Sequence, residues 1–105
     1  MRALAVTGAT RSEALPNIPT VGEFVAGYEA IGWYGLGAPK DTPAGIISKL
    51  NHEINAALAD PTIKGRLLAL GAEPMPMTPA DFGKFMSDET EKWAKVIRAA
   101  HIKPE

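Results

Sequence analysis

Apolar residues recur at helical spacing over the second half of the chain. In three stretches they fall three or four residues apart, so that each stretch has one apolar face and one polar face. This spacing predicts three amphipathic helices between residue 43 and the end of the chain. The apolar faces are Ile46, Ile47, Leu50, Ile54, Ala57 and Leu58 in the first; Ile63, Leu67 and Leu70 in the second; and Phe82, Phe85, Met86, Trp93, Val96, Ile97 and Ala100 in the third.

Each predicted helix has its own start signal. The pairs 42–43, 60–61 and 78–79 all place a Thr or Asp before a proline, which combines a good N-cap with a residue suited to the first helical position. The second helix should stop at Gly71, because glycine readily takes the left-handed conformation that ends helices. On the outer face of the third, ion pairs are expected between Asp88 and Lys92 and between Glu91 and Lys95.

The first 39 residues have a different pattern. Residues 2–7 form a short apolar run that ends at a glycine, which predicts a buried strand. Residues 28–39 mix aromatic and aliphatic residues with three glycines, which indicates an irregular strand. Between these segments Thr20 is expected to cap a single helical turn that runs through Phe24. The predicted class is α/β, with two extended segments followed by three helices.

Composition and charge remove several classes of function. The chain of 105 residues has a formal net charge of -1 and no cysteine. It therefore has no basic field for nucleic acid, no disulfide framework and no thiolate nucleophile. The longest early apolar run, residues 3–6, is too short for a secretory signal. We expect no targeting segment here: a complete product of this sequence would stay in the cytoplasm, and a fragment would have its signal upstream.

Side chains that could carry catalysis or bind metal are few. Ser48, His52 and Glu53 lie close together on the first predicted helix, but on its polar side and without a pocket, so they fit a solvated surface better than a nucleophile and its base. His52 and His101 lack the spacing of metal ligands. We therefore expect no catalytic residue, no metal site and no cofactor.

Three features have both a functional and a structural interpretation. The loop 8–12 follows the first extended segment, where α/β folds place ligand-binding loops, but it also fits an ordinary turn. Trp33 either stacks on a ligand or packs in the core, and Tyr34 should point to the opposite face. Glu89 interrupts the apolar stripe of the last helix, so it needs an ion pair or an exposed edge. Trp93 lies in register with that stripe and is expected in the core.

The order of short motifs along the chain is more specific than any one of them. The stretches RALAVTGATRS, ALPNIPTVGEF, GYEAIGWYGLGAPKDTP, IISKLNHEINAALADP, LLALGAEP and TPADFGKFMSDETEKWAKVIRAAHIKPE cover nearly the whole sequence. In this order they resemble the carboxy-terminal part of the tripartite tricarboxylate transporter receptors, the TctC or Bug family of periplasmic solute-binding proteins. Departures from the family pattern are Asn17, Gly22 and His101, which stand where the family often has Asp, Ala and Gly.

This resemblance implies the carboxy-terminal fragment of a two-lobed periplasmic-binding-protein fold of type II, the Venus-flytrap arrangement. Residues 1–30 would end the second lobe, residues 31–39 would cross the hinge, and residues 40–105 would be the helical part of the first lobe. The implied ligands are small carboxylates, such as di- or tricarboxylates or amino acids, held largely by main-chain N–H groups. A membrane permease is the implied partner. Only Thr7 and Trp33 carry over as residues near the cleft, so the site in this chain is expected to be incomplete.

Two other functions remain open from the residues alone. The chain could be a free-standing helical interaction module whose apolar faces pair with another copy, as a homodimer or a domain-swapped oligomer, or with a different partner. It could also be a small hydrolase that uses Ser48 or Ser12. A reading frame that continues upstream to a signal peptide would favour the receptor.

Overall fold

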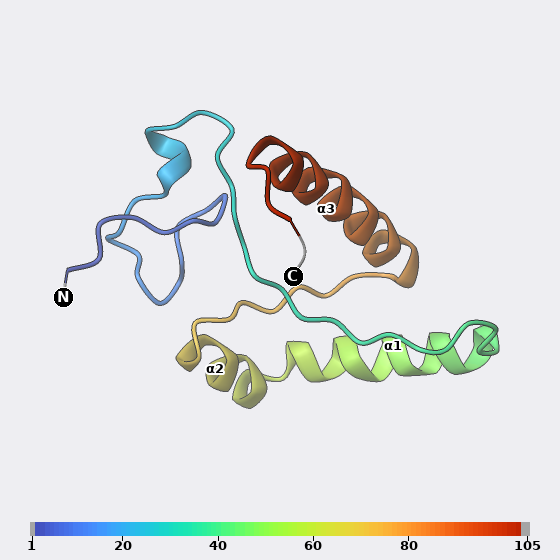
Figure 1. Ribbon diagram of the computed structural model, residues 1–105. Coiled ribbons are helices and arrows are strands. Elements are labelled where there is room, and N and C mark those ends of the chain that lie inside the picture. The colour runs from blue at the N-terminus through green and yellow to red at the C-terminus, as the bar shows by residue number, and fades with distance from the viewer. Residues whose placement is uncertain (1, 104–105) are drawn as a thin grey trace. The chain divides into compact units, whose positions relative to one another are not determined.

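The computed structural model describes residues 2–103, and the elements within that range are one 3-10 turn and three α-helices (Figure 1). The turn is η1 (Val21–Glu23), and the helices are α1 (Ala44–Ala59), α2 (Pro61–Ala69) and α3 (Pro79–Ala99). The chain divides into two units. The first contains Met1–Pro39 and Asp60–Pro74, and the second contains Lys40–Ala59 and Met75–Glu105.

Two helices begin at the predicted residue. The Asp60 carboxylate accepts hydrogen bonds from the N–H groups of Thr62 and Ile63 at 2.9 and 3.0 Å, and α2 starts at the next residue, a proline. The Thr78 hydroxyl caps α3 in the same way, by accepting from Asp81 N at 3.1 Å. Both caps supply acceptors for N–H groups that have no partner inside the helix. α1 begins at Ala44, one residue later than expected.

The ends of α2 and α3 share one geometry. Gly71 follows α2 with φ 76°, and His101 follows α3 with φ 53°. After α3, His101 N donates to Arg98 O at 3.2 Å and Ile102 N donates to Ile97 O at 3.1 Å. This pair of bonds is the Schellman motif, and α2 ends with the equivalent pair. Gly71 therefore ends α2 as predicted, and a histidine takes the corresponding left-handed position after α3.

The extended segment of residues 2–7 pairs with the rest of the first unit at only a few points. Val6 and Thr20 form an isolated parallel bridge, and Ala30 N donates to Thr7 O at 2.9 Å. Neither residues 2–7 nor residues 28–39 form a regular strand in the described part of the chain, so the expected strands are not confirmed. A ladder needs a partner along its length, and these segments have only single points of pairing. Thr20 does cap a single turn, η1, as expected.

Polar contacts connect α2 to the loop 12–15 within the same unit. Lys64 of α2 forms an ion pair with Glu13 at 3.3 Å. The Glu13 N–H donates to the Glu73 carboxylate at 3.2 Å. All of these groups are exposed to solvent, so each contact stabilises the unit by only about 0–1 kcal/mol.

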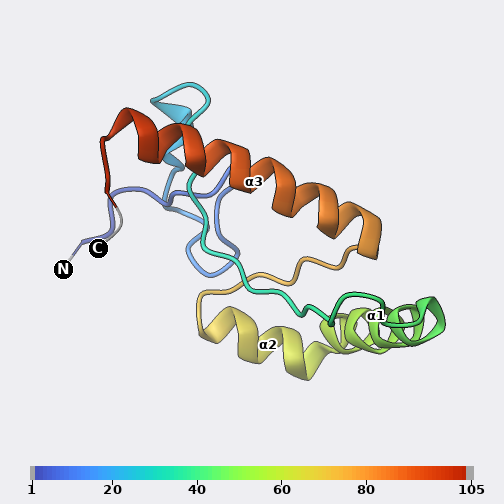
Figure 2. The ribbon, with the colours of Figure 1, turned by 45° about the vertical axis from the view of Figure 1, so that its right-hand side comes forward.

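Asparagine side chains join the two helices of the second unit. Asn51 and Asn55, one turn apart on α1, both donate to the Met77 carbonyl, at 2.8 and 3.0 Å. Met77 belongs to the extended segment that leads into α3, a segment that can be followed in Figure 2, and α1 and α3 contact each other. The two amides thereby fix the start of α3 against α1.

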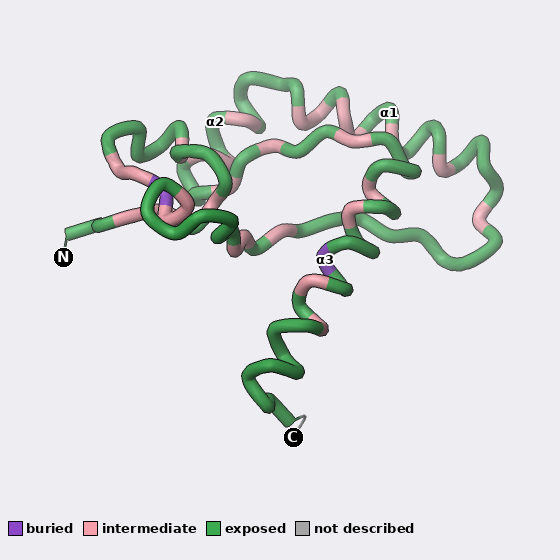
Figure 3. The backbone as a smooth tube through the Cα atoms, turned by 90° about the horizontal axis from the view of Figure 1, so that it is seen from above, coloured by how far each residue is buried: buried purple, intermediate pink, exposed green. Residues whose placement is uncertain are grey.

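Apolar burial is very limited throughout the described residues. None of their hydrophobic side chains is buried, and the buried residues among them are Thr20 and Glu89 (Figure 3). The apolar faces predicted from the sequence exist, but much of their surface lies open to solvent.

Individual exposures correct two expectations. Leu70, expected to point inward, is 83% exposed, because it lies at the C-cap of α2 rather than on its apolar face. Trp93, expected in the core, is 38% exposed. Trp93 lies on the apolar face of α3, but in the described part of the chain the other segments do not shield this face completely from solvent.

Candidate functional site

The structure brings the segment of Thr7 next to the segment that leads to Trp33. Thr7 is exposed and Trp33 is half-buried. Their segments are joined by the hydrogen bond from Ala30 N to Thr7 O, three residues before Trp33. A Cβ built on Gly8 would lie 3.8 Å from the Ile31 side chain, an ordinary van der Waals distance, so the Ile31 side chain lies next to Gly8. Both candidate residues therefore belong to the same local part of the first unit.

The loop 8–12 is held by a charged clasp. Arg11 donates two hydrogen bonds to the Glu23 carboxylate, from Nε at 2.9 Å and from an Nη at 2.8 Å. This bidentate arrangement is the strong geometry for an arginine and a carboxylate. Arg11 lowers the pKa of Glu23 to about 2, with help from the Thr20 N–H, and the pKa of Arg11 is raised by the same contact. Glu23 uses two of the five N–H donors of Arg11 and balances its charge, so Arg11 attracts an anionic ligand less strongly than an unpaired arginine would.

Glu23 also completes the cap of η1. Thr20 N donates to Glu23 at 3.0 Å, and Glu23 N donates to the Thr20 hydroxyl at 3.2 Å. This reciprocal pair is a capping box, and Thr20 is only 4% exposed. The Thr20 cap agrees with the expectation from the sequence, whereas the role of Glu23 was not expected. The signal was present, because a threonine followed three residues later by a glutamate marks this motif.

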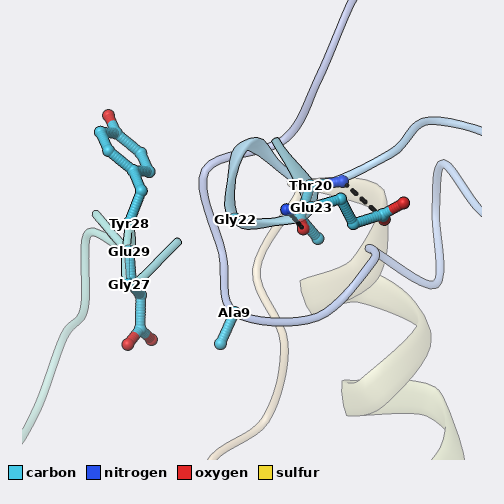
Figure 4. Close-up of a pocket in the computed structure, with 7 residues that line it drawn as sticks. All are labelled: Ala9, Thr20, Gly22, Glu23, Gly27, Tyr28 and Glu29. Atoms are coloured by element: carbon cyan, nitrogen blue, oxygen red, sulfur yellow. Dashed lines mark hydrogen bonds between the residues drawn. The ribbon is translucent and has the colours of Figure 1, made fainter. Parts of the chain in front are cut away.

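An open hollow of about 400 Å³ lies beside η1 (Figure 4). On its far side, Tyr28 and Glu29 point in opposite directions from the backbone. The charged lining side chains are the carboxylates of Glu23 and Glu29, and no Lys, Arg or His contributes to the lining, which consists of Ala9, Thr20, Gly22, Glu23, Gly27, Tyr28 and Glu29. The Glu23 charge is balanced by Arg11, and the lining itself supplies no side-chain cation to attract an anion, so this hollow alone does not form a carboxylate site.

Gly22 allows a close approach in this region. A Cβ at residue 22 would lie 3.2 Å from the Tyr28 carbonyl oxygen, which is tighter than an ordinary van der Waals contact. Gly22 is one of the positions at which the sequence departs from the pattern of the family it resembles. A larger residue here would push residue 28 away from η1.

The other candidate residues form no reactive group. Ser48, His52 and Glu53 are all exposed on α1, in agreement with a solvated helix surface. Ser12 accepts a hydrogen bond from Ala14 N at 3.3 Å, so its hydroxyl shapes a local turn. Within residues 2–103, no three His, Cys, Asp or Glu side chains gather in a way that would hold a metal ion.

Glu89 has the structural role expected for a charge inside an apolar stripe. It is 8% exposed, forms an ion pair with Lys92, and accepts a hydrogen bond from Trp93 Nε1 at 2.9 Å. The expected pair of Asp88 with Lys92 is therefore wrong: Lys92 turns to the less hydrated carboxylate, where the attraction between charges is stronger. Asp88 pairs with Lys84 instead.

The expected ion pair on the outer face of α3 is confirmed, because Lys95 lies 2.8 Å from Glu91.

No helix in the described part of the chain is long and apolar enough to cross a membrane.

Comparison with known proteins assigns the chain to one family. The sequence profile of the tripartite tricarboxylate transporter family receptor matches residues 1–102. Protein BugT of Bordetella pertussis is 38% identical over 106 residues, which cover 98% of this chain and 32% of that protein. A UPF0065 protein of Agrobacterium vitis is 40% identical over 104 residues, covering 95% of this chain and 30% of that protein.

A solved structure matches as well. Rpa4515 of R. palustris with adipate has a TM-score of 0.82 and 38% identity, over 97% of this chain and 34% of that chain. The chain thus spans about a third of the length of these three proteins, and its fold is one part of a larger fold. With the motif order, the profile and the structure in agreement, the chain belongs to the tripartite tricarboxylate transporter receptor family, a family of receptors rather than enzymes.

Proposed function

We propose that this chain is the carboxy-terminal part of a two-lobed periplasmic receptor that captures small carboxylates for a tripartite tricarboxylate-type transporter and its membrane permease. The observation that carries the proposal is the absence of any buried hydrophobic side chain among residues 2–103. The three helices are well formed and α2 and α3 are capped, yet the apolar faces are open, as expected for a piece built against a larger body. The relatives are about three times as long as this chain, which agrees with such a body.

The ligand class rests on family membership and on one neighbour. The structure of Rpa4515 contains adipate, a dicarboxylate, and that chain is 38% identical to this one. In the described part of this chain, Arg11 is engaged by Glu23 and the hollow beside η1 is lined by carboxylates. We infer that the cations or N–H donors that hold the ligand lie mainly in the rest of the receptor.

Thr7 and Trp33 are the contributions to the cleft that we propose for this chain. The exposed Thr7 hydroxyl can donate a hydrogen bond to a carboxylate, and the ring of Trp33 can cover the aliphatic part of a dicarboxylate. The segment of residues 31–39 would cross the hinge, with residues 1–30 in the second lobe and residues 40–105 in the first. The two units described above arise from contacts within this chain alone, so these boundaries remain a prediction.

Calorimetry with adipate and citrate tests the proposal. The 105-residue chain should bind either acid no tighter than about 1 mM, whereas a receptor extended upstream by the missing two-thirds should bind its preferred acid in the micromolar range. In that receptor Thr7→Val should weaken binding by about tenfold, the cost of one hydrogen bond to a charged group, and leave the melting temperature unchanged. Tight one-to-one binding by the short chain alone would refute the proposal that its site is incomplete.

The upstream reading frame offers a second test. The proposal expects about two hundred further residues in frame, from the share of the relatives that this chain covers, preceded by a secretory signal. A frame that is closed immediately before Met1 would favour the alternative of a free-standing helical interaction module. The observation that supports this alternative is the solvent exposure of apolar side chains on α3.

A further inference from the structure

Residues 6–11 are tied at both ends to η1 and its cap, and we refer to them as the tethered loop. At one end Val6 forms the parallel bridge with Thr20, through backbone hydrogen bonds of 2.8 and 2.9 Å to the residues on either side of it. At the other end the Arg11 guanidinium binds the Glu23 carboxylate through two hydrogen bonds. Since Thr20 and Glu23 belong to one capped turn, both ends of the tethered loop are fixed to a single anchor.

One carboxylate couples the anchor to the tethered loop. Oε1 of Glu23 accepts from Arg11 Nε at 2.9 Å and from Thr20 N at 3.0 Å (Figure 4), and Oε2 accepts from an Arg11 Nη at 2.8 Å. The anchor itself is well fixed, because Thr20 is nearly buried and takes part in the capping box. The clasp between Arg11 and Glu23 thereby connects a buried cap to a loop that lies in solvent.

The tethered loop depends on these polar contacts. Most of its residues are exposed, namely Thr7, Ala9, Thr10 and Arg11, and no hydrophobic side chain in the described part of the chain is buried. Fixing a backbone segment costs conformational entropy. Because apolar packing contributes little here, the hydrogen bonds at the two ends have to offset that cost.

Thr7, which we propose as a ligand contact, belongs to the tethered loop. Its carbonyl accepts from Ala30 N at 2.9 Å, so the tethered loop also meets the segment that leads to Trp33. A side chain whose backbone is already in place binds a ligand more tightly than one that must first be ordered. The position of the tethered loop therefore bears on ligand affinity even where its other residues do not touch the ligand.

We propose that Arg11 and Glu23 are positioning residues of the receptor, whose ion pair holds the tethered loop, and with it Thr7, in the arrangement that receives a small carboxylate. This inference rests on the proposed function and adds two residues that act through Thr7 rather than on the ligand itself.

Calorimetry tests the inference on a protein in which the proposed upstream part of the receptor is present, with adipate or citrate, whichever it binds more tightly. Two variants break the clasp without changing the net charge. Arg11→Lys keeps the charge but lacks the fork that forms two parallel bonds. Arg11→Gln combined with Glu23→Gln removes both charges, and glutamine can still accept from Thr20 N in the capping box. Each variant should weaken binding by at least about threefold.

A matched control removes another exposed ion pair of the same unit. Lys64→Gln combined with Glu13→Gln breaks the pair at 3.3 Å, whose side chains are 45% and 60% exposed, against 48% and 40% for Arg11 and Glu23. The control should change the melting temperature about as little as the clasp variants do, and it should leave the affinity unchanged.

The Thr7→Val background separates positioning from a general structural role. If the clasp acts through Thr7, breaking it in a receptor that already carries Thr7→Val should weaken binding by less than about twofold. A merely structural role would give the same loss in both backgrounds. In the free receptor, amide exchange within residues 6–11 should also be faster in the clasp variants than in the control.

Loss of affinity in both clasp variants, absent from the control and from the Thr7→Val background, supports the inference. Clasp variants that bind like the unsubstituted receptor, a control that weakens binding equally, or an equal loss in both backgrounds would each overturn it and leave the proposed function standing. An unsubstituted receptor that binds neither acid would refute the proposed function, and this inference with it.

Discussion

Replacing His101 with glycine should strengthen the end of α3. His101 has φ 53°, the left-handed conformation, which costs a residue with a Cβ roughly 1–2 kcal/mol. Glycine removes that cost but loses about 0.5–1 kcal/mol more backbone entropy on folding. The net gain in the free energy of unfolding is therefore about 0.5–1 kcal/mol. The two Schellman hydrogen bonds that end α3 involve backbone groups only, so the substitution leaves them in place.

Gly71 provides the reciprocal experiment. It occupies the same position after α2, with φ 76°, and nothing lies within 4 Å of a Cβ built there. Gly71→His should therefore lower the free energy of unfolding by roughly the amount that His101→Gly raises it. The cause is the backbone conformation and not a steric clash. Urea unfolding followed by far-UV circular dichroism measures both. If His101→Gly proved neutral or destabilising while Gly71→His was destabilising, the argument from backbone strain at residue 101 would be refuted.

Three further predictions follow from individual contacts. Glu23 has a folded pKa of about 2 against an ordinary 4.5. Its contribution to the free energy of unfolding is therefore present above about pH 4.5 and is lost as the pH falls toward 2. Glu23→Gln should flatten this part of the curve of unfolding free energy against pH. Glu89→Ala leaves the Trp93 Nε1–H without its acceptor and should cost about 1–3 kcal/mol, more than Glu89→Gln, in urea unfolding followed by tryptophan fluorescence. The cost of changing both Asn51 and Asn55 to Ala should differ from the sum of the two single changes, because the two amides share the Met77 carbonyl as acceptor and also bond to each other; simple additivity in urea unfolding would contradict this.

Local signals explain why the helices could be predicted from the sequence. The caps at Asp60 and Thr78 depend on N–H groups two or three residues away, and Gly71 ends α2 through its own backbone freedom. Such contacts are complete within one stretch of sequence. They form whether or not the rest of a protein is present, so pattern and position were enough to place them.

The extended segments could not be predicted in the same way. Whether residues 2–7 form a strand depends on partners at a distance, and this chain supplies a single bridge from Val6 to Thr20. The side-chain partner of Lys92 also depends on tertiary context, because burial of Glu89 decides the competition with Asp88. Neither spacing nor propensity contains that information.

The candidate site was only partly accessible from the sequence. The resemblance selected Thr7 and Trp33, and the structure places their segments side by side. The clasp between Arg11 and Glu23 was not foreseen, because it joins residues twelve apart across a loop whose path is not encoded in a repeating pattern. The clasp changes the chemical picture, since the charge of Arg11 is already balanced by Glu23.

Amide hydrogen exchange tests most directly whether the apolar faces of this chain are built for a larger body. Exchange in α1 and α3 should be compared between the 105-residue chain and a protein in which the proposed upstream part of the receptor is present. If that part covers these faces, both helices should exchange at least about a hundredfold more slowly in the longer protein. Equal protection of α1 and α3 in the two proteins would show that the chain is complete without a covering body, and would contradict the account.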